Sequence, residues 1–248
     1  MHAEAHGGAR RHSRCFPPAA RSHPRRMAAS DSQERSLKSF QKMAGRKVLI
    51  VYAHQEPKSF NGSLKRVAVE ELSKQGCSVT VSDLYAMQFE PRATRNDIVG
   101  CLHNSEEFDY GMETSEAYKR GGLSSDLIEE QKKVQEADLM IFQFPLYWFS
   151  MPAIMKGWMD RVLVQGFAHE FPNCYDSGLL KNKLALFSFT TGGSKEMYAK
   201  GSINGDIRYL MWPMQVSMEL CTSVVSKSLH LTSALLQSMS LKRRGRTC

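Results

Sequence analysis

The chain has 248 residues, 42% of them hydrophobic and 9% aromatic, which is typical of a globular protein with one large domain or two small ones. No apolar run is long enough for a membrane-spanning helix, and the six cysteines are scattered without a C-x-x-C pair, as is typical of reduced cytosolic thiols. The net charge of +8 divides into +6 for residues 1–42, −2 for residues 43–215 and +4 for residues 216–248. The basic character therefore belongs to the two ends, and the central part is predicted to bind neither nucleic acid nor membrane.

Residues 1–42 are rich in Arg, Ser, Ala and His and lack apolar periodicity, so they are predicted to be a disordered basic extension. An Arg- and Ser-rich, acid-poor stretch can also be a mitochondrial transit peptide, but Pro17, Pro18 and Pro24 would interrupt the amphipathic helix that such a peptide needs. We therefore favour an extension ahead of an internal start at Met43, and a cytoplasmic location.

From Lys47 onward, strand and helix patterns alternate. The first strand is predicted from Val48–Val51, four apolar residues of which three are β-branched, a run that suits a strand covered on both faces. Residues 84–125 show little periodicity and form a long predicted connection. The predicted strands are 47–53, 77–83, 139–144 and 183–189. The predicted helices are about 60–75, 126–136 and 152–164, and the first of them ends at Gly76. This order predicts an α/β fold with a doubly wound parallel sheet, which binds ligands at the carboxyl ends of its strands.

The loop after the first predicted strand is a candidate anion site. A polar loop that leads into a helix points backbone N–H groups and the positive end of the helix dipole at a ligand. This loop matches neither the G-x-G-x-x-G nor the P-loop pattern, and instead offers His54, Ser59, Asn61 and Ser63 as small polar donors. These residues suit a diphosphate held without a metal. The alternative is an ordinary capped helix after a core strand.

Two further clusters follow the next predicted strands at the same edge of the sheet. The segment Pro145–Phe149 follows the third strand and is rich in aromatic rings, which suit a flat heterocycle. The segment Thr190–Gly193 follows the fourth strand and combines hydroxyl donors with close backbone approach. The three loops could converge on one ligand. The alternative for the aromatic segment is a packed cluster under a loop.

The segments KVLIVYAHQEPKSFNGSLK, FQFPLYWFSMPAIMKGWMDRVL, YDSGLL and TTGGSKEMY, followed by INGD, resemble the FAD-dependent quinone reductases of the flavodoxin-like fold. The resemblance runs from Met43 to about Gln215. It implies a homodimer with active sites at the dimer interface. It also implies hydride transfer from a dihydronicotinamide donor to FAD, and then from the flavin to a quinone, as a two-electron reduction.

The resemblance also implies roles for individual residues. Tyr198 and Asn204 would be catalytic, although Tyr198 could instead be a plain wall that stacks on the flavin ring. Asn204 stands where the NAD(P)H-using sister enzyme has His, which points to dihydronicotinamide riboside as the preferred donor. The partner subunit would cover the substrate with His169, Glu170 and Phe171, and His169 departs from the apolar aromatic residue of the close relative, which could alter quinone preference. The FAD would be bound by His54, Phe60, Asn61, Gly62, Ser63, Leu146, Tyr147, Trp148, Phe149, Thr190, Thr191, Gly192, Gly193 and Tyr198.

After Gln215 the sequence departs from the family. Residues 216–248 are predicted to be a divergent tail, so that the last strand and the terminal helix of the fold are missing or replaced. The histidines of the family's metal site are absent, and Cys221 and His230 are poor substitutes, so no metal is predicted. Two competing interpretations follow: a catalytically weak variant that binds flavin or dimerises, and an unstable product without function.

Overall fold

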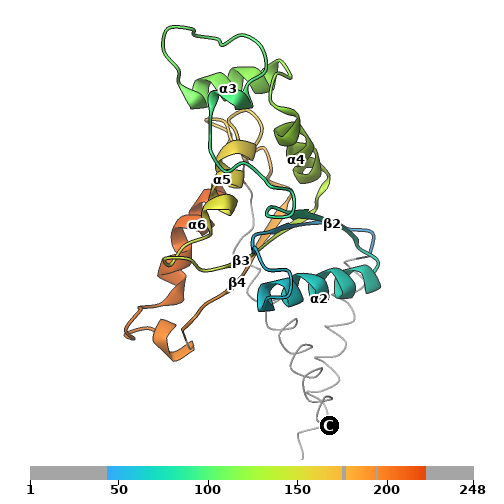
Figure 1. The fold of residues 1–248 in the computed structure, drawn as a ribbon, viewed down its shortest axis with the longest axis vertical. Coiled ribbons are helices and arrows are strands. Elements are labelled where there is room, and N and C mark those ends of the chain that lie inside the picture. The colour runs from blue at the N-terminus through green and yellow to red at the C-terminus, as the bar shows by residue number, and fades with distance from the viewer. Residues whose placement is uncertain (1–43, 175–176, 194, 222–248) are drawn as a thin grey trace, which may run out of the picture. The chain divides into compact units, whose positions relative to one another are not determined.

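The computed structural model describes residues 44–174, 177–193 and 195–221 (Figure 1). The predicted extension 1–42 and most of the predicted tail lie outside these residues. Four parallel strands form one sheet in the order β2-β1-β3-β4, which confirms the predicted flavodoxin-like α/β fold. The strands are β1 (Lys47–Tyr52), β2 (Ser78–Asp83), β3 (Leu139–Pro145) and β4 (Leu184–Thr190). The helices are α2 (Phe60–Lys74), α3 (Tyr110–Lys119), α4 (Ser125–Glu136), α5 (Ala153–Val162) and α6 (Ile207–Cys221), with short 3-10 turns η1 (Arg95–Asp97) and η3 (Lys195–Tyr198).

The two central strands, β1 and β3, are apolar because both of their faces are covered. Alternate side chains of a strand point to opposite faces, so Val48 and Ile50 pack with Leu72 of α2. Their neighbours Leu49 and Val51 belong to the larger core on the opposite face, which α4, α5 and α6 cover (Figure 1). The helices therefore hold the carboxyl ends of the strands in place from both sides.

Helix α2 begins and ends as the sequence predicts. Ser59 is its N-cap, and the Ser59 hydroxyl accepts a hydrogen bond from the Gly62 backbone N–H at 3.0 Å. Gly76 follows the C-cap with a φ of +79°, a left-handed conformation that glycine adopts without steric cost. Both predicted helix limits are therefore confirmed.

The connection after β2 contains helix α3 and the 3-10 turn η1, which the weak periodicity of residues 84–125 does not reveal. The physical reason is that α3 buries polar side chains, among them Glu113, Thr114 and Ser115. The carboxylate of Glu113 accepts the backbone N–H groups of His103 at 2.7 Å and Asn104 at 2.6 Å. Buried groups that bond to a neighbouring loop replace the apolar face by which a helix is usually recognised.

A buried ion pair fixes this connection to α5. Arg161 donates to both carboxylate oxygens of Asp97, at 2.8 and 3.1 Å, and Tyr110 donates to the same carboxylate at 2.6 Å. Arg161 also donates to the Glu90 carbonyl oxygen at 2.6 Å and pairs with Asp126 at 3.0 Å. Burial, together with the hydrogen bond to Asp97, raises the pKa of Tyr110 well above its usual range, so this hydroxyl stays a donor.

Helix α6 runs through Cys221 and so crosses the predicted boundary at residue 215. Its side chains Met214 and Met218 are buried in the larger core. The start of the divergent segment therefore contributes to the folded domain. Within the described ranges, no helix is long and apolar enough to cross a membrane.

Candidate functional site

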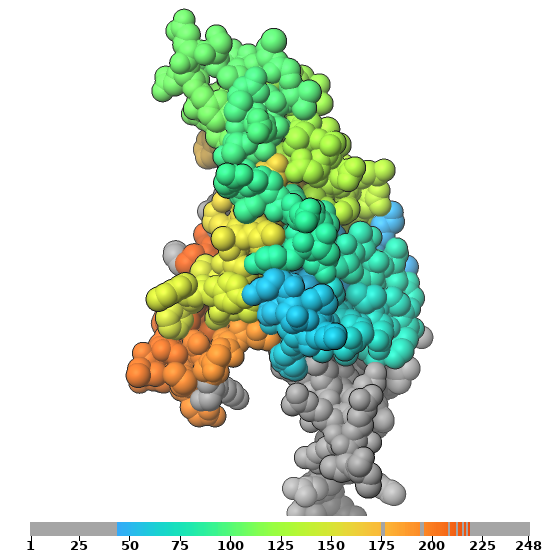
Figure 2. Space-filling view, in the orientation of Figure 1, coloured from blue at the N-terminus to red at the C-terminus, as the bar shows by residue number. Residues whose placement is uncertain are grey.

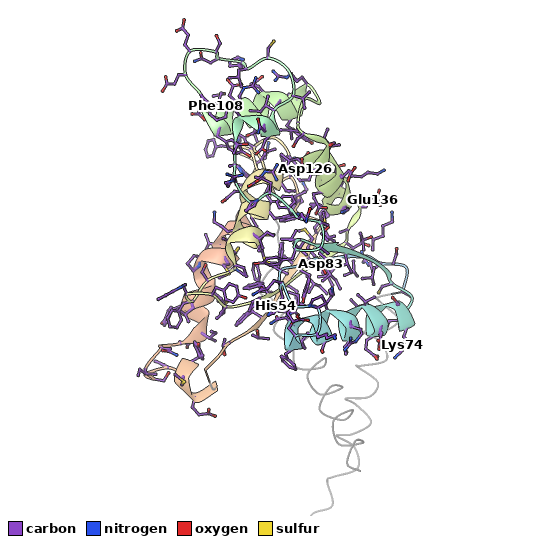
Figure 3. All side chains as sticks on the ribbon, in the orientation of Figure 1. His54, Lys74, Asp83, Phe108, Asp126 and Glu136 are labelled. Carbon is purple, nitrogen blue, oxygen red and sulfur yellow. The ribbon has the colours of Figure 1, made fainter. Side chains whose placement is uncertain are left out.

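The loop between β1 and α2 is built as a polar cradle. The backbone N–H of Glu56 donates to Nδ1 of His54 at 3.0 Å, which leaves Nε2 as the ring nitrogen that can donate to a ligand; His54 is labelled in Figure 3. A Cβ on Gly62 would lie 2.1 Å from the Pro57 carbonyl oxygen, so only glycine fits the first turn of α2. Among the described residues, the backbone N–H of Asn61 has no acceptor. The loop and the helix end therefore present donors suited to an anion.

A two-residue hairpin follows β3. Tyr147 and Ser150 exchange backbone hydrogen bonds of 2.9 and 3.0 Å, and the two residues between them have positive φ, 51° for Trp148 and 59° for Phe149. Asn and Gly are the usual residues of such a turn, because bulky side chains are strained there. Nevertheless, 96% of Trp148 is exposed, so its ring gives the folded chain almost no burial. Backbone strain that presents an exposed ring is typical of a binding site.

Hydrogen bonds tie the three loops at the carboxyl edge together. The Tyr147 hydroxyl and the Gln55 amide bond at 3.1 Å, which joins the loop after β1 to the hairpin after β3. The Leu146 backbone N–H donates to the Thr190 carbonyl oxygen at 2.8 Å, which joins the hairpin to the end of β4. In Figure 2 the blue atoms after β1 adjoin the yellow-green atoms after β3. The three predicted clusters therefore share one edge, next to the neighbouring strands β1 and β3 where the order of the sheet reverses.

The loop after β4 holds the two predicted catalytic residues. The Thr191 hydroxyl donates to the Gly193 carbonyl oxygen at 2.9 Å, and a Cβ on Gly193 would lie 2.9 Å from the ring of Tyr198. The Asn204 backbone N–H donates to the Met197 carbonyl oxygen at 3.1 Å. Tyr198 therefore lies against the glycine segment, and Asn204 is bonded to the residue that precedes Tyr198.

The predicted substrate-binding residues lie elsewhere in the chain. The His169 carbonyl oxygen accepts the Gly166 backbone N–H at 2.9 Å, and this turn packs on α3, where the Tyr118 and Phe167 rings are 5.7 Å apart. Phe171 is 90% exposed. Among the described residues, no hydrogen bond or ring contact joins His169, Glu170 or Phe171 to the loops at the carboxyl edge. Their action from a partner subunit stays a prediction.

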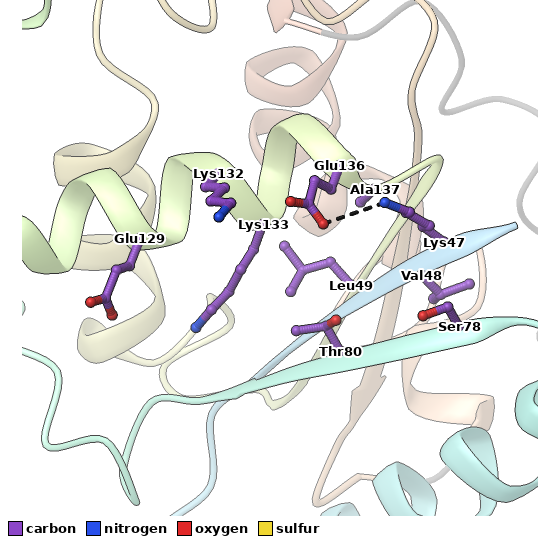
Figure 4. Close-up of a pocket in the computed structure, with 10 residues that line it drawn as sticks. All are labelled: Lys47, Val48, Leu49, Ser78, Thr80, Glu129, Lys132, Lys133, Glu136 and Ala137. Carbon is purple, nitrogen blue, oxygen red and sulfur yellow. Dashed lines mark hydrogen bonds and ion pairs between the residues drawn. The ribbon is translucent and has the colours of Figure 1, made fainter.

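A pocket of about 350 Å³ lies at the opposite edge of the sheet, against α4 (Figure 4). Its charges are largely paired within the chain: Lys47 with Glu136 at 3.5 Å, and Lys133 with Glu130. It contains none of the predicted ligand-binding residues, so we assign the site to the carboxyl edge and not to this pocket. Over the part of the chain that the structure describes, no group of His, Cys, Asp and Glu side chains could hold a metal, and His230 lies outside that part.

Sequence reasoning missed Gln143 and Ser188, which lie beneath the site. Gln143 is 3% exposed and donates to Oδ1 of Asn61 at 2.8 Å, and Ser188 donates to Gln143 at 2.6 Å. The signal was present, because Gln143 is the one polar residue in the buried strand LMIFQFP. A buried amide requires hydrogen-bond partners, so its position near the end of a core strand indicates a polar neighbour.

Comparison with known proteins identifies the class of this fold and site. The sequence model of the flavodoxin-like fold family matches residues 46–240. The chain is 73% identical over 173 residues to the ribosyldihydronicotinamide dehydrogenase (quinone) of Rattus norvegicus, an alignment that covers 70% of this chain and 75% of the relative. It is 54% identical over 173 residues to the NAD(P)H dehydrogenase (quinone) 1 of the same organism, which covers 70% of this chain and 63% of that relative.

A solved structure agrees with these sequences. A protein of Klebsiella pneumoniae, named as a proposed quinone reductase, superimposes with a TM-score of 0.70 and 36% identity, over 79% of this chain and 84% of the other. The chain therefore belongs to the flavodoxin-like fold family and, within it, to the NAD(P)H dehydrogenase (quinone) family. This confirms the resemblance read from the sequence motifs.

Proposed function

We propose that this chain binds FAD and catalyses the two-electron reduction of quinones to hydroquinones, with a dihydronicotinamide donor and a preference for dihydronicotinamide riboside. The observation that carries the proposal is the junction of three loops at the carboxyl edge, where an anion cradle lies beside exposed aromatic rings. The 73% identical relative is named for this chemistry. The donor and the quinone of the proposal come from that name, and the exposed rings and helix-end donors at the carboxyl edge support a flavin there.

The residues at this edge fit a flavin dinucleotide. The donors of His54 Nε2 and of the first turn of α2 suit a diphosphate, and no metal ligands are needed there. The Trp148 ring is exposed and suits contact with a flat ring system. A Cβ on Gly192 would meet no atom within 4 Å, so a ligand can approach this backbone closely.

A bound flavin would supply the hydride-transfer chemistry between the donor and the quinone. The residues of the protein would bind and orient the flavin and the substrates. Backbone and hydroxyl donors between Thr190 and Gly193 would hold the polar edge of the ring, and the Tyr198 hydroxyl would donate a hydrogen bond or a proton where negative charge develops. We further propose a homodimer, in which Phe171 of each subunit covers the site of the other, and a cytoplasmic location.

Release of the flavin tests the cofactor. The purified chain should be denatured and the released flavin separated by chromatography. Because the cradle suits a diphosphate, FAD should be recovered in preference to FMN. Recovery of FMN alone would overturn the assignment.

Steady-state rates test the donor. With one quinone held fixed, dihydronicotinamide riboside should be oxidised faster than NADH or NADPH. Asn204→His is the matched variant, because it installs the residue expected of the NAD(P)H-using branch and should raise the relative rate with NADPH. Equal use of NADPH by the unmodified chain would contradict the assigned donor.

A further inference from the structure

A chain of four side chains runs beneath the candidate site from β4 through β3 to α2 and back to β4. The Ser188 hydroxyl donates to Oε1 of Gln143 at 2.6 Å, and Nε2 of Gln143 donates to Oδ1 of Asn61 at 2.8 Å. Nδ2 of Asn61 then donates to Oγ1 of Thr190 at 2.8 Å. Gln143 and Asn61 are each 3% exposed, so water competes little for these bonds.

The order of donors and acceptors has a chemical consequence. In this arrangement the Asn61 oxygen accepts from Gln143, and the Asn61 amide nitrogen faces Thr190. Thr190 Oγ1 already accepts that bond, so the Thr190 proton is left to donate elsewhere. Among the described residues, neither the Thr190 proton nor the second amide proton of Asn61 has an acceptor. Asn61 lies in the first turn of α2 and Thr190 is the last residue of β4, so both border the carboxyl-edge site.

We propose that Gln143 is a positioning residue, which fixes Asn61 and Thr190 as hydrogen-bond donors toward acceptor atoms of the bound flavin. This inference rests on the proposed function, and it names the residue that couples the cradle of α2 to the loop after β4. Gln143 itself touches neither donor nor quinone. It acts by holding the Asn61 side chain between its own amide and the Thr190 hydroxyl.

A buried glutamine does not by itself indicate such a role, and a second buried glutamine, Gln131, provides a comparison within the same chain. Gln131 of α4 is also buried, at 5% exposure, and its Nε2 donates to the Val162 carbonyl oxygen at 3.0 Å. That bond joins α4 to α5 and reaches no loop of the site. Gln143 differs in its connections, because its amide bonds to Asn61 in the first turn of α2 and to Ser188 near the end of β4, both next to the site.

The test compares Gln143→Met with Gln131→Met in the full chain. Methionine keeps the length of the side chain and removes both hydrogen bonds. The dissociation constant of FAD is measured by fluorescence titration of the flavin-free protein, and stability is measured by thermal melting. Both variants should melt below wild type, because each leaves buried polar groups unpaired. Only Gln143→Met should weaken FAD binding, by about tenfold, the effect of roughly 1.4 kcal/mol.

A second pair keeps the proposal falsifiable if Gln143→Met does not fold. Thr190→Val removes the last hydroxyl of the chain with little change of shape and should weaken FAD binding about tenfold, whereas Thr190→Ser keeps the hydroxyl and should stay within about threefold of wild type. Equal FAD affinity in Gln143→Met and Gln131→Met, or in Thr190→Val and wild type, would overturn the role of Gln143. Failure of the wild-type chain to bind FAD is a different result, and it would overturn the proposed function together with this inference.

Discussion

Trp148 combines a strained backbone with an almost fully exposed ring, so replacing it should stabilise the flavin-free protein and weaken flavin binding. Trp148→Gly removes both the strain and the ring. Gln88→Gly is the matched control, because Gln88 is an exposed residue with a similar φ of 50° that belongs to no loop of the site. The two variants relieve the same kind of strain, and only one of them removes a ring from the candidate site.

The magnitude follows from the geometry of Trp148. An L-residue in the left-handed backbone conformation costs about 1–2 kcal/mol of folding free energy relative to glycine. The greater conformational freedom of glycine in the unfolded chain offsets about 0.5–1 kcal/mol of the gain from the substitution. The ring is 96% exposed, so its loss removes only about 10 Å² of burial, or roughly 0.25 kcal/mol. The net gain is about 0.5 kcal/mol, a rise in Tm of about 1–2 °C.

Thermal melting and FAD titration of the flavin-free protein measure the two effects. Both variants should melt slightly above wild type. Trp148→Gly should bind FAD about tenfold more weakly, in the range of a lost aromatic contact, while Gln88→Gly should bind FAD like wild type. A fall in Tm for Trp148→Gly would show that the ring supports the fold. Unchanged FAD affinity would show that the Trp148 ring does not contribute to flavin binding.

Two further predictions concern the connection between β2 and α4. Arg161→Met leaves the buried Asp97 carboxylate unpaired and should lower the free energy of unfolding in denaturant by about 3–5 kcal/mol. Asp126→Asn, at the exposed end of the cluster, should lower it by less than about 1 kcal/mol. Similar losses for the two variants would contradict the buried pairing. Burial pushes the pKa of Glu113 upward, but the backbone N–H groups of Asn104 and His103 outweigh it and lower the pKa. Because the folded pKa is lowered, the stabilisation is present above the unfolded pKa and is lost as the pH falls through the folded value. Glu113→Gln should therefore melt below wild type at about pH 7, and the difference should shrink as the pH falls below about 4.3, the usual pKa of glutamate. A difference that stays constant into the acid range would refute the assignment.

The parts of the fold that follow from apolar patterning were predictable from the sequence. Val48–Val51 and the run that begins at Leu139 identify the central strands, and Ser59 and Gly76 identify the ends of α2, because each of these features has a local physical cause. Helix α3 was missed because its buried face is polar. Helix α6 was missed because its sequence is apolar without a clear helical period and because Pro213 lies inside it.

Some features of the candidate site could likewise be predicted from the sequence, and others could not. Strand ends place the three loops at one edge of the sheet, so topology predicts that His54, Trp148 and Thr190 lie near one another. The hydrogen bonds between Gln143 and its neighbours depend on the register of β1, β3 and β4, which local sequence does not specify. The positive φ at Trp148 was equally hidden, because bulky residues rarely adopt it.

The most direct test of the proposed function separates its two half-reactions. The protein is reconstituted with FAD and mixed without oxygen with one equivalent of dihydronicotinamide riboside, while the blue absorbance band of the flavin is followed. The band should bleach, and one equivalent of a quinone added afterwards should restore it, because donor and quinone use the flavin in turn. A band that does not bleach, or that bleaches and does not return on addition of quinone, would contradict the assignment of this chain as a quinone reductase.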